Sequence, residues 1–374
     1  MTLGPKPVPF VDLTAQTRTL RSELLDVFGE VLDESAFVGG PRVAAFEAAF
    51  ARFTGTRHAV GGGSGTDALE VALRSLDIGA GDEVIVPAHT FIATPLAVLR
   101  AGATPVFVDV RLPDLLIDPA GVERALTPRT RALIPVHLYG QIAPMGDLAD
   151  VVHGRGIAVV EDLAQAQGAQ RDGKAAGTFG AVNATSFYPC KNLGAFGDGG
   201  AVVTDDGDLA TRCRALRNYG SEVKYEHPLL GLNSRLDPLQ AAALQVKLRH
   251  LPAWNDARAQ AARRYDGLLA EHCDAARPVE VARGSKPVFH LYVVRVPRRD
   301  EVRRRLDEEG IRTGIHYPVP CHLQGAMAGL GHTEGDFPVA EAAAKEILSL
   351  PMFPEISVLQ QVRVVEALAR ALET

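Results

Sequence analysis

Seven short apolar segments between residues 58 and 204 most narrowly limit the possible folds, because spacers of helical length separate most of them. The segments are rich in residues that favour strands, and this alternation predicts an α/β domain with a mainly parallel, seven-stranded sheet. Only a glycine-rich loop separates the last two, so we expect a change of strand order or an antiparallel strand there. The segments span 58–60, 83–87, 105–109, 131–137, 157–162, 184–188 and 200–204.

Helical periodicity flanks this region. Apolar residues recur at helical spacing over 20–55, with a Gly-Gly-Pro break at 39–41, and predict two amphipathic helices. Residues 234–251 predict a long helix with Asp237 as its N-cap and Pro238 at its first position.

The C-terminal part of the chain shows a different pattern. An apolar strand at 288–296, a charged helix at 299–310, the segment 311–318 and a final helix predict a smaller α+β domain. We therefore expect a large domain over 1–250, which binds the ligand, and a small one over 251–374. The N-terminal helices could pack on the small domain.

Charge and composition favour a small-molecule ligand. The 374 residues carry a formal charge of −6, without the clusters of lysine and arginine that nucleic acids or anionic membranes require. The N-terminus lacks the pattern of a signal peptide, and no apolar run reaches the roughly 18 residues of a membrane span. We therefore expect neither secretion nor a place in the membrane.

Cysteine usage predicts neither a zinc site nor a disulfide framework. The four cysteines are scattered, and none belongs to a CxxC pair. This pattern favours a reducing cytoplasm. The cysteines are Cys190, Cys213, Cys273 and Cys321.

The first chemical signal is the glycine cluster within 58–73, where a strand passes through a turn into a helix. Such a turn suits a phosphate, because main-chain N–H groups and the positive end of the helix dipole converge there. No lysine follows the glycines, which argues against a P-loop. The cluster fits a dinucleotide pattern, but the acid expected after 83–87 is missing, so we discount it. A plain turn capped by Thr66 remains the alternative.

The second signal is the pair Glu161 and Asp162 at the end of a buried strand. An acid at the carboxyl end of a parallel strand lies on the ligand-binding edge of an α/β sheet. The pair would suit a metal, acid–base chemistry or a cationic ring nitrogen. For Asp162, capping of a following helix is the structural alternative.

The third signal is Lys191, which lies among aromatic, glycine and small apolar residues. Desolvation there would lower the pKa of the amine and make it nucleophilic. The segment alone also allows the side chain to extend to solvent. Taken together, a phosphate turn, a strand-end acid and a desolvated lysine are what pyridoxal phosphate requires.

With these signals in place, the chain resembles the DegT/DnrJ/EryC1/StrS family of pyridoxal-phosphate-dependent sugar aminotransferases. The resemblance implies the aspartate-aminotransferase-type fold, known as fold type I. It covers nearly the whole chain, in seven stretches whose order makes the match specific. They are FVGGPRVAAFEAAFARFTGTRHAV, GTDAL, VIVPAHTFIATPLAVLRAGATPVFVDV, EDLAQAQGA, SFYPCKNLGAFGDGGAVVT, GLNSRLDPLQAAAL and GIHYPVPCHLQ.

The resemblance assigns roles to residues around the cofactor ring. Lys191 matches the family's Schiff-base lysine, which makes it the catalytic residue, and Asp162 matches the partner of the pyridine nitrogen. Gln165 matches the residue that hydrogen-bonds the phenolic oxygen, and Phe91 matches the aromatic residue that stacks on the ring. For Phe91, an ordinary core position is the alternative.

Other cofactor contacts follow from the same resemblance. Gly65 and Thr66 match the phosphate turn, and Ser186 adds a hydroxyl. Asn233 resembles an asparagine that reaches the phosphate from the neighbouring subunit, which implies a homodimer with shared active sites. No role beyond packing is assigned to Cys190.

The loop 316–322 resembles the family's loop near the sugar nucleotide, so Tyr317 and His322 become candidates for substrate contact. Its histidines and cysteine also suggest a metal site. However, two prolines make the loop extended rather than a compact ligand set, and we expect no metal.

The expected function is transfer of an amino group from L-glutamate to C3 of a dTDP-3-keto-6-deoxyhexose. Pyridoxamine phosphate would be the aminated form of the cofactor. C4-keto nucleotide sugars and keto-inositols are alternative acceptors, and glutamine remains open as donor. Some relatives carry histidine at this position and dehydrate their substrates. The presence of Lys191 argues against that activity for this chain. Outside this class, the rivals are a non-catalytic regulatory subunit and a dinucleotide-dependent oxidoreductase.

Overall fold

All seven predicted strands form in the computed structural model, which describes residues 6–373. Strands β3, β2, β4 and β5 pair in parallel in that order, whereas β8, β9 and β1 form antiparallel pairs. Parallel bridges from Asp162 to Val136 and Ala184 join the two groups into one mixed sheet. Among these strands β9 alone is reversed, which confirms the predicted fold class and the antiparallel strand. The strands are β1 (His58–Gly62), β2 (Glu83–Pro87), β3 (Thr104–Val108), β4 (Thr130–Leu133), β5 (Ala158–Val159), β8 (Asn183–Ser186) and β9 (Gly200–Thr204).

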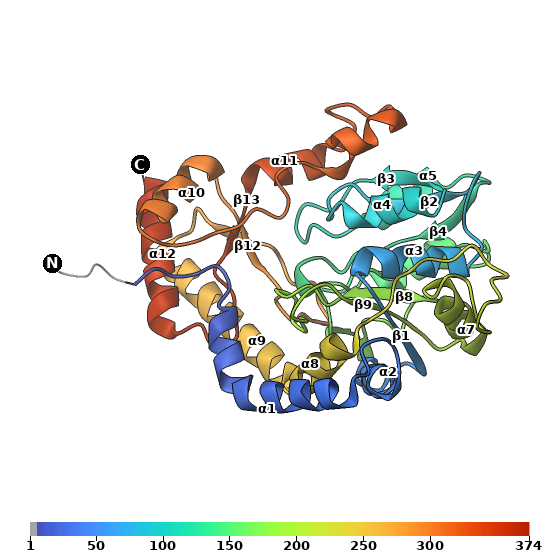
Figure 1. The fold of residues 1–374 in the computed structure, drawn as a ribbon. Coiled ribbons are helices and arrows are strands. Elements are labelled where there is room, and N and C mark those ends of the chain that lie inside the picture. The colour runs from blue at the N-terminus through green and yellow to red at the C-terminus, as the bar shows by residue number, and fades with distance from the viewer. Residues whose placement is uncertain (1–5, 374) are drawn as a thin grey trace.

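Helices cover both faces of this sheet (Figure 1). Along β2, Val84 and Val86 pack with the layer of α3, α4 and α7, whereas Ile85 packs on the opposite face, as alternation along a strand requires. The opposite layer contains α2, α5, α6 and α8. The helices are α2 (Pro41–Thr54), α3 (Gly65–Ser75), α4 (Ala93–Arg100), α5 (Pro119–Ala125), α6 (Met145–Val152), α7 (Gly207–Leu216) and α8 (Pro238–Leu248).

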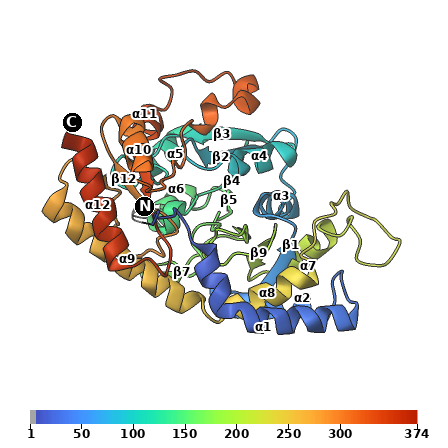
Figure 2. The ribbon, with the colours of Figure 1, turned by 60° about the vertical axis from the view of Figure 1, so that its left-hand side comes forward.

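The first helix, α1 (Leu13–Glu34), ends before the predicted break, where Gly39 and Gly40 adopt positive φ angles. Leu20 and Leu24 of α1 pack against α8, and Figure 2 shows α1, α2 and α8 along the lower edge of the molecule. Ahead of α1, Val8 forms main-chain hydrogen bonds with residues 310 and 312 of the small domain. The segment around Val8 therefore contacts the small domain, and the following helix α1 packs on the large one.

The small domain has its own core, in which α9, α10 and α12 pack on an antiparallel sheet of order β10-β12-β13. In Figure 1 this domain lies on the left. Helix α9 follows α8 directly and was not predicted as a separate helix. The elements are α9 (Leu251–His272), β10 (Arg277–Pro278), β12 (Tyr292–Arg295), α10 (Arg299–Glu308), β13 (Ile347–Leu350) and α12 (Val358–Glu373).

One part of the C-terminal region packs against the large domain. The short helices η2 (Cys321–Leu323) and η3 (Gly325–Leu330) lead into α11 (Pro338–Glu346), and Phe337 shares a core with Phe107 of β3. Asp109, directly after β3, accepts hydrogen bonds from the first N–H groups of α11, both at 2.9 Å. This cap fixes the segment over the ligand-binding edge of the sheet.

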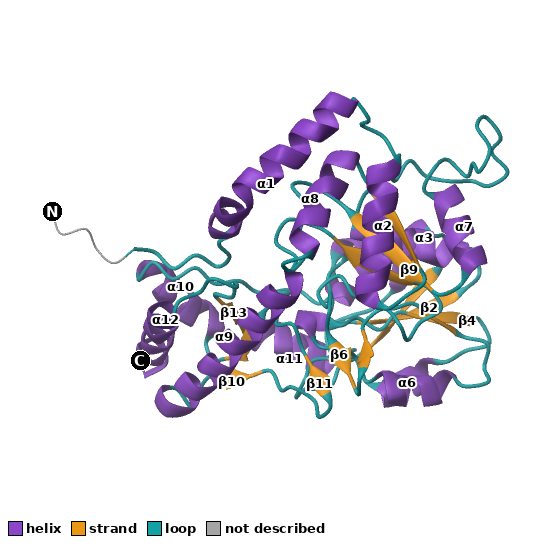
Figure 3. Cartoon of the chain, turned by 90° about the horizontal axis from the view of Figure 1, so that it is seen from below, coloured by secondary structure: helices purple, strands orange, loops and turns teal. Residues whose placement is uncertain are grey.

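A separate short sheet and a single-turn helix lie outside the elements above. β6 (Gln170–Arg171), β7 (Lys174–Ala175) and β11 (Ser285–Lys286) form a separate short sheet, visible in Figure 3, and η1 (Leu138–Gly140) follows β4. Among the helices of residues 6–373, none combines the length and apolar character that a bilayer span requires.

Candidate active site

The glycine cluster forms a turn into the N-terminus of α3. Ser64 is the N-cap, and its hydroxyl accepts a hydrogen bond from the main-chain N–H of Asp67 at 3.1 Å. A Cβ at Gly65 would lie 2.6 Å from the Cβ of Ser186, and one at Gly200 would lie 2.4 Å from the carbonyl oxygen of Ser64. Glycine is therefore required for β8 and β9 to approach the turn this closely. The N–H groups at the start of α3 and the Ser186 hydroxyl suit an anion.

The segment that carries Asn233 supports the same turn. The Ser234 hydroxyl accepts a hydrogen bond from the N–H of Gly63 and donates one to Asp67, both at 2.9 Å. Asn233 itself is exposed. The structure thus places Asn233 beside the turn of its own chain with its side chain accessible, and its predicted contact across subunits stays a prediction.

Asp162 lies at the carboxyl end of the sheet with a 7% exposed side chain. Its carboxylate accepts hydrogen bonds from the Thr94 hydroxyl at 2.9 Å and from the N–H of Ala164 at 3.2 Å. Burial raises the pKa of Asp162, while the Thr94 hydrogen bond and the nearby Lys191 charge oppose that rise. The following residues form turns rather than a helix, so helix capping does not explain this carboxylate.

Glu161, the other acid of the pair, faces away from Asp162 into the protein. It accepts hydrogen bonds from His137 at 2.8 Å and from the N–H groups of Gly177, Phe179 and Gly180 at 2.6–2.8 Å. With four donors, the buried carboxylate is fully occupied, so Glu161 holds the strand end in place.

Lys191 is half-buried in the loop between β8 and β9. Burial lowers the pKa of its amine, and the nearby Cys190 and Asp162 oppose that shift. The loop is held from behind by α8: Gln240 accepts a hydrogen bond from the N–H of Phe196, and Lys247 donates one to the carbonyl of Gly194, both at 2.7 Å. The structure therefore favours the desolvated amine over a lysine that extends to solvent.

Gln165, Tyr317 and Phe91 form a second part of the site. Gln165 donates a hydrogen bond from Nε2 to the Tyr317 hydroxyl at 3.1 Å, and the rings of Tyr317 and Phe91 lie 5.4 Å apart. Phe91 is 50% exposed, so it is not an ordinary core residue. The structure thus brings these three predicted residues together.

His322 does not fit its expected contact with substrate. Its side chain is 1% exposed, packs against Phe107 and Phe337, and lies 3.0 Å from a carboxylate oxygen of Glu341. The prediction was wrong for this structure, because the imidazole is used to hold the segment that precedes α11. Over residues 6–373, no group of three or more candidate ligands is placed to bind a metal ion.

Sequence reasoning missed two polar residues of the site, Thr94 and Tyr139. Tyr139 lies just beyond the predicted strand 131–137, and Thr94 follows the strand 83–87 by one loop. The position of Tyr139 directly after a predicted strand could have identified it, whereas Thr94 lies in the first turn of α4 and no strand end indicates it. Cys190 is half-buried, burial raises its pKa, and nothing in the structure gives it a role.

The DegT/DnrJ/EryC1/StrS aminotransferase family matches residues 18–369. The chain is 51% identical to dTDP-3-amino-3,4,6-trideoxy-alpha-D-glucose transaminase of Streptomyces venezuelae, over 96% of this chain and 95% of that protein. It is also 48% identical to the pleiotropic regulatory protein of Geobacillus stearothermophilus (97% and 98% covered). It is 48% identical to UDP-N-acetyl-3-dehydro-alpha-D-glucosamine 3-aminotransferase of Acidithiobacillus ferrooxidans (98% of each).

Solved structures agree with this placement. DesV of S. venezuelae, in complex with a ketimine intermediate, has a TM-score of 0.96 and 50% identity, over 99% of this chain and 100% of that one. NtdA of Bacillus subtilis, with bound cofactor PMP, has a TM-score of 0.92 and 31% identity (100% and 87% covered).

Proposed function

The chain belongs to the DegT/DnrJ/EryC1/StrS aminotransferase family, and from that premise we propose that it aminates C3 of a dTDP-linked 3-keto-6-deoxy sugar. L-glutamate is the proposed donor and pyridoxal phosphate the cofactor. The observation that carries the proposal is the convergence of the α3 turn, Asp162 and Lys191 on one edge of the sheet. The acceptor is inferred from the S. venezuelae relative, whose name specifies a dTDP-linked 3-amino sugar.

The residues present fit pyridoxal phosphate. The main-chain N–H groups of Gly65 and Thr66 and the Ser186 hydroxyl would hold its phosphate. Asp162 would pair with the ring nitrogen, and Lys191 would bind the cofactor covalently. When bound, the cofactor supplies an electron sink for the charge that forms as a proton leaves the substrate carbon.

Lys191 and Asp162 carry the proton chemistry in this proposal. Burial lowers the pKa of the Lys191 amine, so more of it is neutral at pH 7 and able to take a proton from the substrate carbon and return it to the neighbouring carbon. Asp162 would face the ring nitrogen of the bound cofactor, where the hydrogen bonds from Thr94 and Ala164 favour the charged carboxylate against the effect of burial. Phe91 and Tyr317 would limit the access of water to this region.

A panel of nucleotide-linked keto sugars tests the acceptor. With glutamate as donor, we expect the highest kcat/KM for a dTDP-3-keto-6-deoxyhexose, because its keto carbon matches the 3-amino product of the relative above. Liquid chromatography of the amino sugars would measure it. Faster turnover of a C4-keto sugar, a keto-inositol or a UDP-linked 3-keto sugar would reassign the substrate.

The purified protein also tests whether the chain is instead a non-catalytic regulator, an alternative that the name of the Geobacillus relative raises. A transaminase should show cofactor absorbance that shifts when glutamate is added. A protein that binds the cofactor but shows neither this shift nor turnover of any sugar would be the regulator instead.

A second copy of the chain is the proposed partner, in a homodimer with shared active sites. The loop between α7 and α8 projects from the molecule at the right of Figure 2, and it exposes Tyr225 (83%) and Leu230 (85%) next to the segment of Asn233. Exposed apolar side chains of this size are typical of an interface. We also place the reaction in the cytoplasm, since the four cysteines are free.

Coexpression of two inactive chains tests the shared site. Lys191→Ala and Asn233→Ala proteins should each have low activity, but their heterodimer combines both intact residues at one of its two sites. Random pairing then restores about a quarter of wild-type activity, as measured by amino-sugar production. Absence of recovery in a purified heterodimer, or a monomer in sedimentation, would contradict the proposal.

A further inference from the structure

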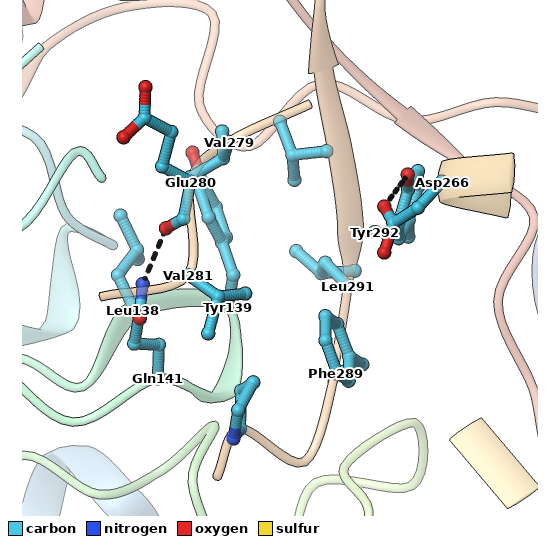
Figure 4. Close-up of a pocket in the computed structure, with 12 residues that line it drawn as sticks. Leu138, Tyr139, Gln141, Asp266, Val279, Glu280, Val281, Phe289, Leu291 and Tyr292 are labelled. Carbon is cyan, nitrogen blue, oxygen red and sulfur yellow. Dashed lines mark hydrogen bonds between the residues drawn. The ribbon is translucent and has the colours of Figure 1, made fainter. Parts of the chain in front are cut away.

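Tyr139 occupies a turn where the two domains meet. It lies in η1 with a φ of 60°, and its side chain is 6% exposed. The turn is bonded to the small-domain side: Gly140 accepts a hydrogen bond from the N–H of Val288 at 3.0 Å, and Gln141 donates one to the carbonyl of Glu280, also at 3.0 Å. Figure 4 shows Gln141 and Glu280 beside Tyr139. The position of Tyr139 is therefore fixed by both domains.

A cavity beside Tyr139 is not a ligand site. Its volume is about 40 Å³, and its lining is largely apolar, including Leu138, Leu291 and Phe289 (Figure 4). A space of this size has room for a few water molecules but not for a sugar or a cofactor. Any functional role of Tyr139 must therefore come from its polar groups.

The main-chain N–H of Tyr139 orients Gln165. It donates a hydrogen bond to Oε1 of Gln165 at 2.7 Å. Because that oxygen is occupied by a donor, the amide nitrogen is the group that faces Tyr317, to whose hydroxyl it donates at 3.1 Å. Gln165 is thereby fixed as a hydrogen-bond donor toward the site.

The hydroxyl of Tyr139 contacts the other side of the site. It donates to the carbonyl of His316 at 2.6 Å and lies 2.8 Å from Nε2 of His89. Burial lowers the pKa of His89 to about 4, so His89 is neutral at pH 7. The Tyr139 hydroxyl proton is used in the hydrogen bond to the His316 carbonyl. In the contact between His89 and Tyr139, Nε2 of His89 must therefore be the donor.

These contacts close a network across the domains, made of Tyr139, Gln165, Tyr317 and the His316 carbonyl. We propose that Tyr139 is a positioning residue. It holds the side chains of Tyr317 and Gln165 in the relative positions that the keto-sugar half of the reaction requires. The peptide of the His316 carbonyl leads directly into Tyr317, so Tyr139 fixes the main chain of the residue whose hydroxyl Gln165 contacts. This inference rests on the proposed function.

Tyr139→Phe tests the proposal, because it removes the hydroxyl and leaves the ring and the N–H in place. We expect the KM for the keto sugar to rise about fivefold, which corresponds to about 1 kcal/mol. The glutamate half-reaction should stay within about twofold, because the hydrogen bond to Gln165 remains. In the holoenzyme, amide hydrogen exchange of residues 314–319 should become faster.

Tyr265→Phe is the matched control. Tyr265 is fully buried and donates to the carbonyl of Pro351 at 2.9 Å, so the control removes an equivalent hydrogen bond within the small domain. We expect it to lower stability while changing neither the KM for the sugar nor the exchange of 314–319. Equal behaviour of the two variants in both measurements would overturn the role of Tyr139.

A double-mutant cycle with Tyr317→Phe supplies an independent measurement. If the network acts as a unit, Tyr139→Phe should add less than twofold to the KM effect of Tyr317→Phe. Full additivity of the two effects would contradict the proposal, even if Tyr139→Phe is destabilised. A wild-type enzyme that aminates no keto sugar would instead refute the proposed function, and exchange of 314–319 would still test the contact to His316.

Discussion

Replacing Lys191 with alanine is expected to reduce amino-sugar formation by about 10⁴-fold or more. The change removes both the amine that would hold the cofactor and the base that moves the proton, and the loss of a nucleophile or general base has effects of this size. Single-turnover assays with glutamate and with the keto sugar measure the two half-reactions separately. Both should be lost, because the same amine serves both.

The melting temperature distinguishes a loss of chemistry in the Lys191→Ala protein from a loss of its fold. At pH 7 a lysine in the unfolded chain is protonated, whereas burial lowers the pKa of Lys191 in the folded chain, so its burial costs folding free energy. Without cofactor, the alanine variant should therefore melt no lower than wild type. Lys191→Arg keeps a positive charge but no usable nucleophile, and should be equally inactive. Lys174→Ala, at an exposed lysine, should retain full activity. Appreciable turnover by either Lys191 variant would refute the assigned role.

Replacing Asp162 with asparagine is expected to reduce turnover by about 10²- to 10³-fold. The carboxylate would face a cationic ring nitrogen in a buried place, and the loss of one partner from such a pair costs about 3–5 kcal/mol. Asparagine has nearly the same shape and can still accept the hydrogen bond from Ala164, so the fold should persist. Steady-state kinetics and cofactor absorbance against pH would report the loss, the latter as a lower pKa of the ring nitrogen.

Asp114→Asn provides the comparison for a buried aspartate outside the site. Asp114 is 6% exposed and pairs with Arg111 in a loop after β3. Its replacement should lower the melting temperature but leave kcat and the absorbance unchanged. If Asp162→Asn lowered turnover no more than Asp114→Asn, the pairing of Asp162 with the cofactor would be wrong.

The sequence predicted the fold well because its signals were local. Most strands of the large sheet coincide with short apolar runs, although β8 reads Asn-Ala-Thr-Ser, and a change of strand order or an antiparallel strand was expected from the short loop before β9. Helix α9 was missed since it follows α8 with only Arg249 and His250 between them, so helical periodicity alone does not separate the two.

The site was predictable where it depends on strand ends and less so where it depends on contacts between distant segments. Strand position singled out Asp162 as a candidate, whereas Lys191 became one only when its surroundings were considered together with Asp162 and the glycine turn. The interaction of Tyr139 with His316 joins residues 177 positions apart, and no local pattern indicates it. His322 was misassigned for the same reason, because its burial depends on packing against Phe107 of β3, which is far away in the sequence.

The reversed strand β9 also has a consequence for the order of folding. It pairs on one side with β8, just before it, and on the other with β1, whose partners are His58 with Thr204 through Gly62 with Gly200. The phosphate turn follows β1 and the Lys191 loop precedes β9, so the two can meet only after a chain closure of about 140 residues. Contacts of such long range form slowly. During synthesis, the nascent chain must therefore extend beyond residue 204 before the lysine loop and the phosphate turn can come together.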